Sequence, residues 1–260
     1  MKIPKNNRRN FIKNVSAGLG AFYIPLSSKA KNNADEKKKK IVCAGGHPDD
    51  PESGCGGSLA KFALAGNDVT IIYLTTGEAG IEGKSHDEAA AIRKQESLNA
   101  CKILNAKAVF AGQIDGDTIM NNDWVNKMVD LINAEKPDIV FTHWPLDEHK
   151  DHQVASVLTI QSWKEAEQKF ALYFYEVCTG YQSFVFHPTD YVDITEFEEQ
   201  KKKALACHAS QDIVVNDQYT ANMIDCGHPA MQDFRGREFG VKAAEAFIRM
   251  TGRGMGKLVI

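Results

Sequence analysis

From Lys40 onward, short apolar runs rich in β-branched residues alternate with longer segments of helical character. The predicted strands cover residues 41–45, 68–75, 108–111, 138–142, 172–178 and 191–194. The predicted helices cover residues 54–65, 87–105, 123–135, 153–169 and 196–208. This alternation predicts a single α/β domain, a three-layer α/β/α, Rossmann-like fold whose mostly parallel sheet carries helices on both faces. In such sheets, functional sites form beyond the carboxyl ends of the strands.

Charge is distributed unevenly along the chain. The 260 residues include 31 Lys and Arg against 34 Asp and Glu, a net charge of −3. Residues 1–30 contain six of the basic residues and no acidic one, so the remaining residues carry a net charge of −9. Nucleic-acid-binding domains present a basic surface, so this balance argues against a nucleic-acid partner. A small neutral or cationic substrate suits the chain better than a strongly anionic one.

Residues 1–30 have the order of a twin-arginine export signal. The pair Arg8-Arg9 precedes a mild apolar segment, residues 15–26, and the small-residue sequence 28–30. The apolar segment is too short to span a bilayer comfortably, so no stable membrane span is expected. We therefore predict an exported, periplasmic or secreted protein, with a linker at 31–39 and the functional domain at 40–260. A basic disordered tail is the alternative.

The six cysteines are scattered and form no Cys-x-x-Cys pair, which excludes a zinc ribbon or a thioredoxin-like motif. Most of them lie inside apolar runs and are predicted to be buried thiols. Whether any of them pair in a disulfide is left open. They stand at positions 43, 55, 101, 178, 207 and 226.

The first predicted strand is followed directly by a cluster of charge, residues 46–52. The cluster contains His47, Asp49, Asp50 and Glu52. Removing that much charge from water is too unfavourable without a compensating partner, so the cluster predicts a bound cation. The alternative is an Asx-type turn that caps the following helix.

A second cluster, residues 143–152, follows the predicted strand at 138–142 and contains His143, His149, Asp151 and His152. Two such clusters at equivalent ends of parallel strands can converge in space. Catalytic zinc takes three protein ligands of the His, Asp or Glu type and keeps a position open for water. One histidine of the His149-x-x-His152 pair would complete a set begun by the first cluster. A solvated loop leading into a helix is the alternative, and His143 is a competing ligand.

Four segments, in order, resemble the PIG-L (LmbE-like) family of zinc-dependent N-acetylglucosaminyl de-N-acetylases. They are His-Pro-Asp-Asp-x-Glu at 47–52, Thr-Thr-Gly-Glu-Ala-Gly at 75–80, His-Lys-Asp-His at 149–152 and Lys-x-x-Ala-Leu-x-x-His-x-Ser-Gln at 201–211. The similarity spans roughly residues 40–250. One departure is Pro51 between the aspartates and Glu52, and another is the stretch 143–146 before the histidine pair.

The resemblance implies a role for each matching residue. His47, Asp50 and His152 would bind zinc, with iron(II) and cobalt(II) as alternative metals. Asp49 would be the general base that activates a water molecule held by the metal. His149 would polarise the acetyl carbonyl and stabilise the developing oxyanion, and Asp151 would orient or tune His149.

The resemblance also implies the reaction: hydrolysis of the N-acetyl group of an N-acetylated amino sugar, such as an N-acetylglucosamine derivative or glycoconjugate. The partner is then a small-molecule or glycan substrate. Two alternatives remain: an amidase for a non-sugar N-acyl or thiol-conjugate metabolite, and a non-catalytic module that binds metal or sugar. A dinucleotide-binding site is excluded because no Gly-x-Gly-x-x-Gly follows the first strand.

Three further residues have two readings each. Glu52 is expected to support the site rather than bind metal. Arg93 belongs to a charged helix face, with a lesser expectation that it reaches the site. His208 is either a core histidine or part of the site wall.

Overall fold

The computed structural model describes residues 38–166, 169–177, 182–211, 214–215, 218–219 and 228–251. The predicted export signal at residues 1–30 lies outside the described residues, and so do Cys178 and Cys226. The other four cysteines are free thiols, three of them buried and Cys207 half-buried.

The strands lie close to their predicted positions, and further elements follow residue 211. The strands are β1 (Lys40–Gly45), β2 (Asp68–Tyr73), β3 (Lys107–Phe110), β4 (Ile139–His143), β5 (Ala171–Tyr175), β6 (Asp190–Asp193), β7 (Val214–Val215), β8 (Gln218–Tyr219) and β9 (Ala244–Arg249). The α-helices are α2 (Asp50–Leu64), α3 (His86–Leu104), α4 (Asn122–Glu135), α5 (Lys150–Glu165), α6 (Glu198–Leu205) and α8 (His228–Phe239). Two short 3₁₀ helices cover η1 (Thr195–Phe197) and η2 (Ala209–Gln211).

Seven strands form one sheet in the order β3-β2-β1-β4-β5-β9-β6. The first five strands in this order are parallel, while β9 pairs antiparallel with both β5 and β6. The prediction of a mostly parallel α/β sheet is confirmed. Strand β1 lies between β2 and β4, and the strand order reverses beside it. The crevice at such a reversal is where doubly wound sheets bind ligands.

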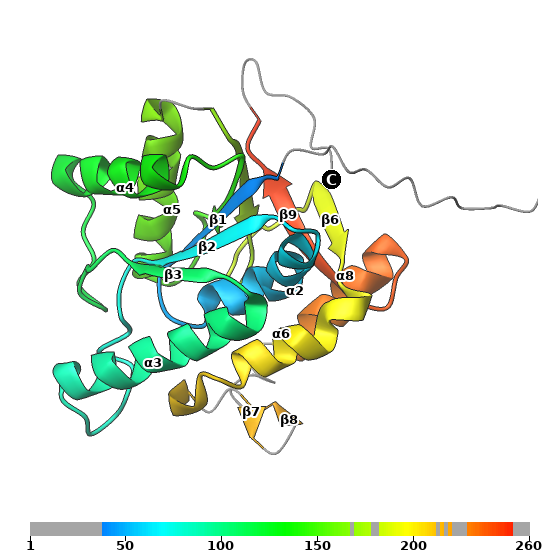
Figure 1. The fold of residues 1–260 in the computed structure, drawn as a ribbon, viewed down its shortest axis with the longest axis horizontal. Helices are drawn as coiled ribbons and strands as arrows, with labels where there is room; N and C mark the ends of the chain where they lie inside the picture. The colour runs from blue at the N-terminus through cyan, green and yellow to red at the C-terminus, as the bar shows by residue number, and fades with distance from the viewer. Residues whose placement is uncertain are drawn as a thin grey trace, which may run out of the picture. The chain divides into compact units, whose positions relative to one another are not determined.

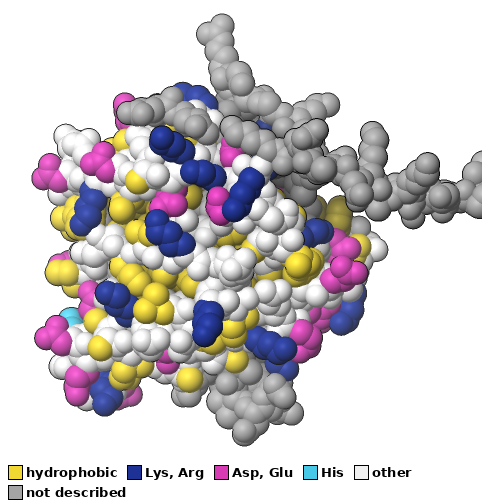
Figure 2. All heavy atoms as spheres, in the orientation of Figure 1, with side chains coloured by type: hydrophobic (Ala, Val, Ile, Leu, Met, Phe, Trp, Pro, Cys, Tyr) yellow, Lys and Arg dark blue, Asp and Glu magenta, His cyan; other side chains and the backbone are white. Residues whose placement is uncertain are grey.

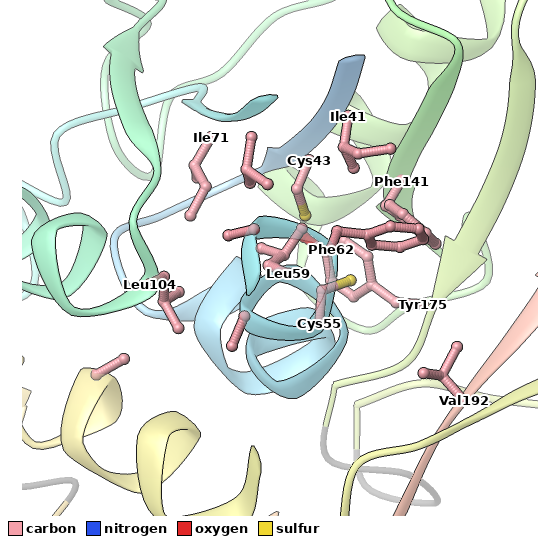
Figure 3. Packing of buried hydrophobic residues seen from close by; sticks show 14 of the residues in the cluster. Ile41, Cys43, Cys55, Leu59, Phe62, Ile71, Leu104, Phe141, Tyr175 and Val192 are labelled. Carbon is pink, nitrogen blue, oxygen red and sulfur yellow. The ribbon is translucent and has the colours of Figure 1, made fainter. Parts of the chain in front are cut away.

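Helices cover both faces of the sheet, and each face has its own hydrophobic core. Helices α4 and α5 lie on one side, and α2, α3 and α6 lie on the other (Figure 1). On the α2 side, Leu59 and Phe62 lie against Cys43 and Phe141 of the sheet (Figure 3). On the other side, buried side chains of α4 and α5 pack on alternate residues of the same strands, among them Val42 and Val140. The side chains of β1 therefore alternate between the two cores, so this strand is buried on both faces, as a central parallel strand requires.

Two helices begin more than one residue earlier than predicted, and both differences concern the charged clusters. Helix α2 begins at Asp50 rather than at residue 54, with Pro51 in its first turn, where the fixed φ of proline suits the helix. Helix α5 begins at Lys150 rather than at residue 153, with His149 as its N-cap. The predicted ligands Asp50 and His152 thus lie in the first turns of two helices, whose amino ends point to the same edge of the sheet.

Helix α2 is fixed to the sheet along its length. A side chain at position 54 would collide with the ring of Tyr175 on β5, so only glycine allows this approach. In the middle of the helix, the N–H groups of Gly57 and Ser58 donate to the carboxylate of Glu245 on β9, at 2.9 and 2.7 Å. That carboxylate is buried and also accepts from Lys201 Nζ of α6 at 2.7 Å. The position of Asp50 therefore depends on contacts with three other elements.

Basic and acidic side chains are both present on the side of the molecule shown in Figure 2. Among the described residues, none of the helices has the length and apolar character needed to cross a membrane.

Candidate metal centre

Both charged clusters lie at the carboxyl ends of adjacent strands, one after β1 and the other after β4. Oδ2 of Asp50 lies 3.2 Å from Nδ1 of His47, and its Oδ1 lies 3.2 Å from Nε2 of His152. One nitrogen atom of each of the histidines His47, His149 and His152 lies within 4.8 Å of the others. The three residues predicted to bind metal are therefore brought together, with His149 beside them.

Asp147 determines how the ring of His152 is presented. Its Oδ1 lies 3.0 Å from Nδ1 of His152, and its Oδ2 accepts from the hydroxyl of Ser183 at 3.2 Å. With Nδ1 as the donor to a carboxylate, Nε2 carries the lone pair and faces Asp50. A carboxylate behind a histidine in this way is the usual support of a metal-binding imidazole.

His143, the competing ligand, is presented differently. Its Nε2 accepts from the backbone N–H of Gly46 at 3.0 Å, and its Nδ1 is buried without a hydrogen-bond partner among the described residues. The ring stacks on His152 with centroids 3.9 Å apart, and its Nε2 lies 3.3 Å from Asp50 Oδ2. Asp50, His143 and His152 thus form a second possible set of donors. The amide of Gly46 already uses the lone pair of His143, which makes His152 the better ligand.

The second ring nitrogen of His47 faces two further carboxylates. Its Nε2 lies 3.1 Å from Oδ1 of Asp115 and 3.1 Å from Oδ2 of Asp151. Asp151 is buried and is held by the N–H of Gly116 and the hydroxyl of Thr118, at 2.8 and 2.6 Å. The carboxylate of Asp151 therefore lies against His47. Asp151 contacts His149 through its backbone N–H, which donates to Nδ1 of His149 at 3.3 Å.

Arg93 reaches the site and holds the residue predicted to be the base. Its guanidinium donates to Oδ2 of Asp49 at 3.1 Å and to the carbonyl oxygen of Pro48 at 2.7 Å. Asp49 has a φ of 103°, which non-glycine residues rarely adopt, and its side chain is 20% exposed. The third acceptor of Arg93 is the carbonyl oxygen of Gly77, where an added Cβ would collide with the guanidinium. The glycine loop at 75–80 makes room for this arginine.

Glu52 and His208 form a buried pair behind the site. Glu52 accepts from the hydroxyl of Tyr73 at 2.5 Å, and its Oε1 lies 3.3 Å from Nε2 of His208. Glu52 and His208 are within ion-pair distance, but the contact lacks the alignment of a hydrogen bond. Neither ring nitrogen of His208 has a hydrogen-bond partner among the described residues. The expectation that Glu52 supports the site agrees with this position. His208 is a buried histidine that touches a supporting residue.

Neighbouring charges shift the ionisable groups in opposite directions. Burial acts to lower the pKa of His152, but Asp50 and Asp147 raise it to about 9. Burial and the nearby His152 lower the pKa of His143 to about 4. Desolvation by the surrounding residues raises the pKa of Asp49 to about 6, against the lowering effect of Arg93. A protonated imidazole beside a carboxylate marks a position where a metal cation can take the place of the proton. Ligands lose their protons when they bind a metal. The donor set fits a divalent cation of the zinc type.

Four residues of the site were missed or given little weight by the sequence patterns: Asp115, Thr118, Asp147 and Arg93. Asp115 and Thr118 lie in the loop after β3, another parallel strand that ends at this edge. Applying the same rule to that strand end would have indicated Asp115. Arg93 lies on a helix with charge on most of its surface, and no local pattern distinguishes it.

Comparison with known proteins gives one family. Residues 42–163 match the model of the PIG-L family, described as GlcNAc-PI de-N-acetylase. The chain is 36% identical to the uncharacterized deacetylase YaiS of Escherichia coli over 124 residues, which cover 45% of this chain and 63% of that protein. It is 30% identical to the diacetylchitobiose deacetylase of Thermococcus kodakarensis over 213 residues, which cover 76% of this chain and 79% of that protein.

The fold is also that of solved structures. The N,N'-diacetylchitobiose deacetylase of Pyrococcus horikoshii, in complex with an inhibitor, aligns with a TM-score of 0.72 and 24% identity over 96% of this chain and 95% of that chain. Not every relative is a deacetylase. The 4-oxalmesaconate hydratase of Pseudomonas putida is 22% identical over 71% of this chain and 78% of that protein.

Proposed function

The chain belongs to the PIG-L family, and we propose that it is a metal-dependent hydrolase that removes the acetyl group from an N-acetylated amino sugar. The observation that carries the proposal is the position of Asp50 between His47 and His152, with the adjacent Asp49 turned to a different partner, Arg93. A metal-binding module has no use for a second carboxylate beside the ligand. A hydrolase needs one to accept a proton.

His47, Asp50 and His152 would hold the metal, which we propose is zinc, with iron(II) and cobalt(II) as alternatives. When bound, the cation lowers the pKa of water and polarises the carbonyl group of the amide. The protein keeps Nε2 of His152 free to bind by engaging its Nδ1 with Asp147. Asp151 and Asp115 place negative charge behind His47 and restrict its ring.

Asp49 is proposed as the proton acceptor. Its unusual backbone conformation directs the side chain away from the cluster around Asp50, toward Arg93. The guanidinium contacts Oδ2, so the other carboxylate oxygen is the one that takes the proton from the attacking water. Arg93 also holds the carbonyl oxygen of Pro48, which fixes the peptide next to Asp49.

His149 is proposed to stabilise the charge that develops on the carbonyl oxygen. Its Nδ1 accepts from the Asp151 N–H, so in the neutral ring Nε2 carries the proton and can donate it. The side chain is half-buried, with its ring centroid 4.7 Å from those of both His47 and His152. Donation of a hydrogen bond to the oxyanion is the task that suits this tautomer, and the proton that Asp49 takes from the water is the one that goes to the leaving amine.

Acetate release distinguishes this function from its alternatives. The panel consists of N-acetylglucosamine, N,N'-diacetylchitobiose, an N-acetyl amino acid and an N-acetylcysteine S-conjugate. We expect the sugars to be deacetylated by the zinc-loaded protein. Release from the last two alone would indicate the non-sugar amidase. If metal is bound but no compound of the panel releases acetate, the hydrolase proposal is wrong. A binding module or a different reaction, such as hydration, would then be the remaining explanation.

Two variants test the roles of the residues. Asparagine tolerates positive φ, so Asp49→Asn should keep both the backbone and the zinc but lose about 100- to 10,000-fold in kcat. His47→Ala should lose zinc as well as activity. Asp117→Asn, at an exposed aspartate in the loop after β3, is the matched control and should change neither. If Asp49→Asn emptied the site in a metal analysis, the roles of the two aspartates would have to be exchanged.

Export is a separate proposal, supported by the sequence of residues 1–30 alone. We expect the full chain to appear in the periplasm or medium of a bacterium that has the twin-arginine route. Replacing Arg8 and Arg9 by lysine should retain it in the cytoplasm. Unchanged export of that variant would contradict the twin-arginine assignment.

A further inference from the structure

Exposed hydrophobic side chains gather at the edge of the sheet that carries the metal centre. Of the eleven large hydrophobic side chains that are exposed among the described residues, six lie in the loops that follow β3, β4 and β5. Such a concentration in three loops is not expected of hydrophobic residues scattered over a surface. We call these six the apolar rim: Ile114, Ile119, Met120, Leu146, Phe184 and Val185.

Each part of the apolar rim is next in sequence to a polar residue that touches the metal centre. Asp115, beside Ile114, contacts His47. Thr118, beside Ile119, donates to Asp151. On the other side of the site, Leu146 precedes Asp147, the partner of His152.

The same arrangement holds in the loop after β5, where Phe184 follows Ser183, whose hydroxyl donates to Asp147. Asp147 and Ser183 are 3% and 1% exposed, whereas the adjoining Leu146 and Phe184 are 53% and 43% exposed. These loops therefore send polar groups into the site and leave hydrophobic groups in water around it.

The loops after β4 and β5 hold their rim residues in fixed positions. The N–H of Phe184 donates to the carbonyl oxygen of Leu146 at 2.8 Å, and Nε1 of Trp144 donates to the carbonyl oxygen of Phe184 at 2.9 Å. Val185 has a φ of 54° and is 67% exposed. A β-branched residue is strained at positive φ, and its exposure brings no burial to compensate. Strained residues of this kind cluster at active sites and ligand-binding segments.

We propose that the apolar rim binds an apolar aglycone of the substrate, so that the preferred substrate is an N-acetylated amino sugar linked to an alkyl or aryl group. This inference rests on the proposed function. The acetamide must reach His47, Asp50 and His152, which are buried at the bottom of the site. In such a sugar the aglycone is attached to C1, next to the carbon that carries the acetamide, so it lies close to the metal centre, at the loops that carry the rim residues. Continuity between rim and metal centre therefore assigns the surface to the substrate itself.

The test compares methyl, propyl and hexyl β-glycosides of N-acetylglucosamine with the zinc-loaded protein. Each methylene that is buried should raise kcat/KM about fourfold, so burial of only two of the five additional methylenes would already make the hexyl glycoside better than the methyl glycoside by more than about tenfold. In the double variant Leu146→Ser/Val185→Asn this ratio should fall close to one. Asparagine adopts positive φ readily, so the variant should keep the loop. Leu64→Ser, at a 79% exposed leucine at the far end of α2, is the control and should keep the ratio.

The outcomes separate the rim from the proposed function. Hydrolysis of all three glycosides at equal kcat/KM would overturn the rim and leave the function intact. If no glycoside is hydrolysed, the proposed function is wrong. Calorimetry with the same glycosides then still tests the rim. Equal affinities for the methyl and hexyl glycosides would overturn the proposal that the rim binds the aglycone. The rim would instead be a membrane contact if the protein showed no hexyl preference but bound phosphatidylglycerol vesicles, and lost that binding in the double variant.

Discussion

Asp147 is the residue whose replacement best tests the proposed metal centre, because it acts on the metal only through another residue. Its Oδ1 accepts from Nδ1 of His152 and from the backbone N–H of His149, at 3.0 and 2.9 Å. Asp147→Ala removes both contacts and also the contact of Oδ2 with the Ser183 hydroxyl. His152 then loses the group that fixes its tautomer and ring orientation, and the first turn of α5 loses a support.

Loss of such a carboxylate typically weakens metal binding by about 10- to 100-fold, or about 1.4–2.7 kcal/mol. Because the contacts with His149 and Ser183 are lost together with the one to His152, we expect Asp147→Ala near the upper end of this range. Asp147→Asn keeps an acceptor at Oδ1 and should lose less than about tenfold. Competition with a chromophoric zinc chelator measures the affinities directly and does not depend on any substrate.

A structural control separates this effect from general destabilisation. Asp138 lies at the opposite end of β4, where its Oδ2 accepts from the N–H of Lys40 at 2.8 Å. Asp138→Ala should lower the free energy of unfolding without changing zinc affinity. If a folded Asp147→Ala protein bound zinc as tightly as the wild type, the assignment of His152 as an oriented ligand would be wrong.

Three further predictions concern groups that surround the centre. Arg93→Met should lower kcat by about 100-fold at unchanged zinc content, because Asp49 loses its partner and a small displacement of a reacting group is costly; Arg237→Met, at an exposed arginine, should leave kcat unchanged. Lys201→Met leaves the Glu245 carboxylate buried without its cation and should cost about 3–5 kcal/mol in urea unfolding; if adding Glu245→Gln restored none of this loss, the ion pair would not be its cause. Burial acts to lower the pKa of His208, but Glu52 raises it, so this contribution to stability is present below the ordinary histidine pKa and is lost as pH rises through the folded-state value. Wild type should therefore exceed His208→Asn by more at pH 6 than at pH 9 in free energy of unfolding, and an equal difference at both values would contradict the pairing.

Local patterns were enough to predict the parallel part of the sheet and the residues at two of its strand ends. Strands such as β1 and β4 are buried on both faces, so they stand out as continuous apolar runs. His47, Asp50, His149 and His152 were indicated because charge directly after such a run needs a partner.

Features that depend on contacts between distant residues were not visible in this way. Strand β9 joins the sheet antiparallel and late in the chain, and its identity depends on pairing with β5 and β6. Arg93 matters only because the loop at 75–80 leaves space for its guanidinium beside Asp49. Helix α2 begins early with Pro51 in its first turn, where proline suits a helix, although proline further along a helix would break it.

The backbone of Asp49 implies a trade-off between stability and activity. A φ of 103° at a residue with a β-carbon costs on the order of 1–3 kcal/mol, which a glycine at the same position would largely avoid. Selection for stability alone would therefore favour glycine at this position, and the proposed role of Asp49 as the base opposes it. Mutational libraries screened for heat resistance should enrich Asp49→Gly, and the same libraries screened for deacetylation should exclude it. The backbone angle of Asp49 thus predicts the position at which the two screens select different residues.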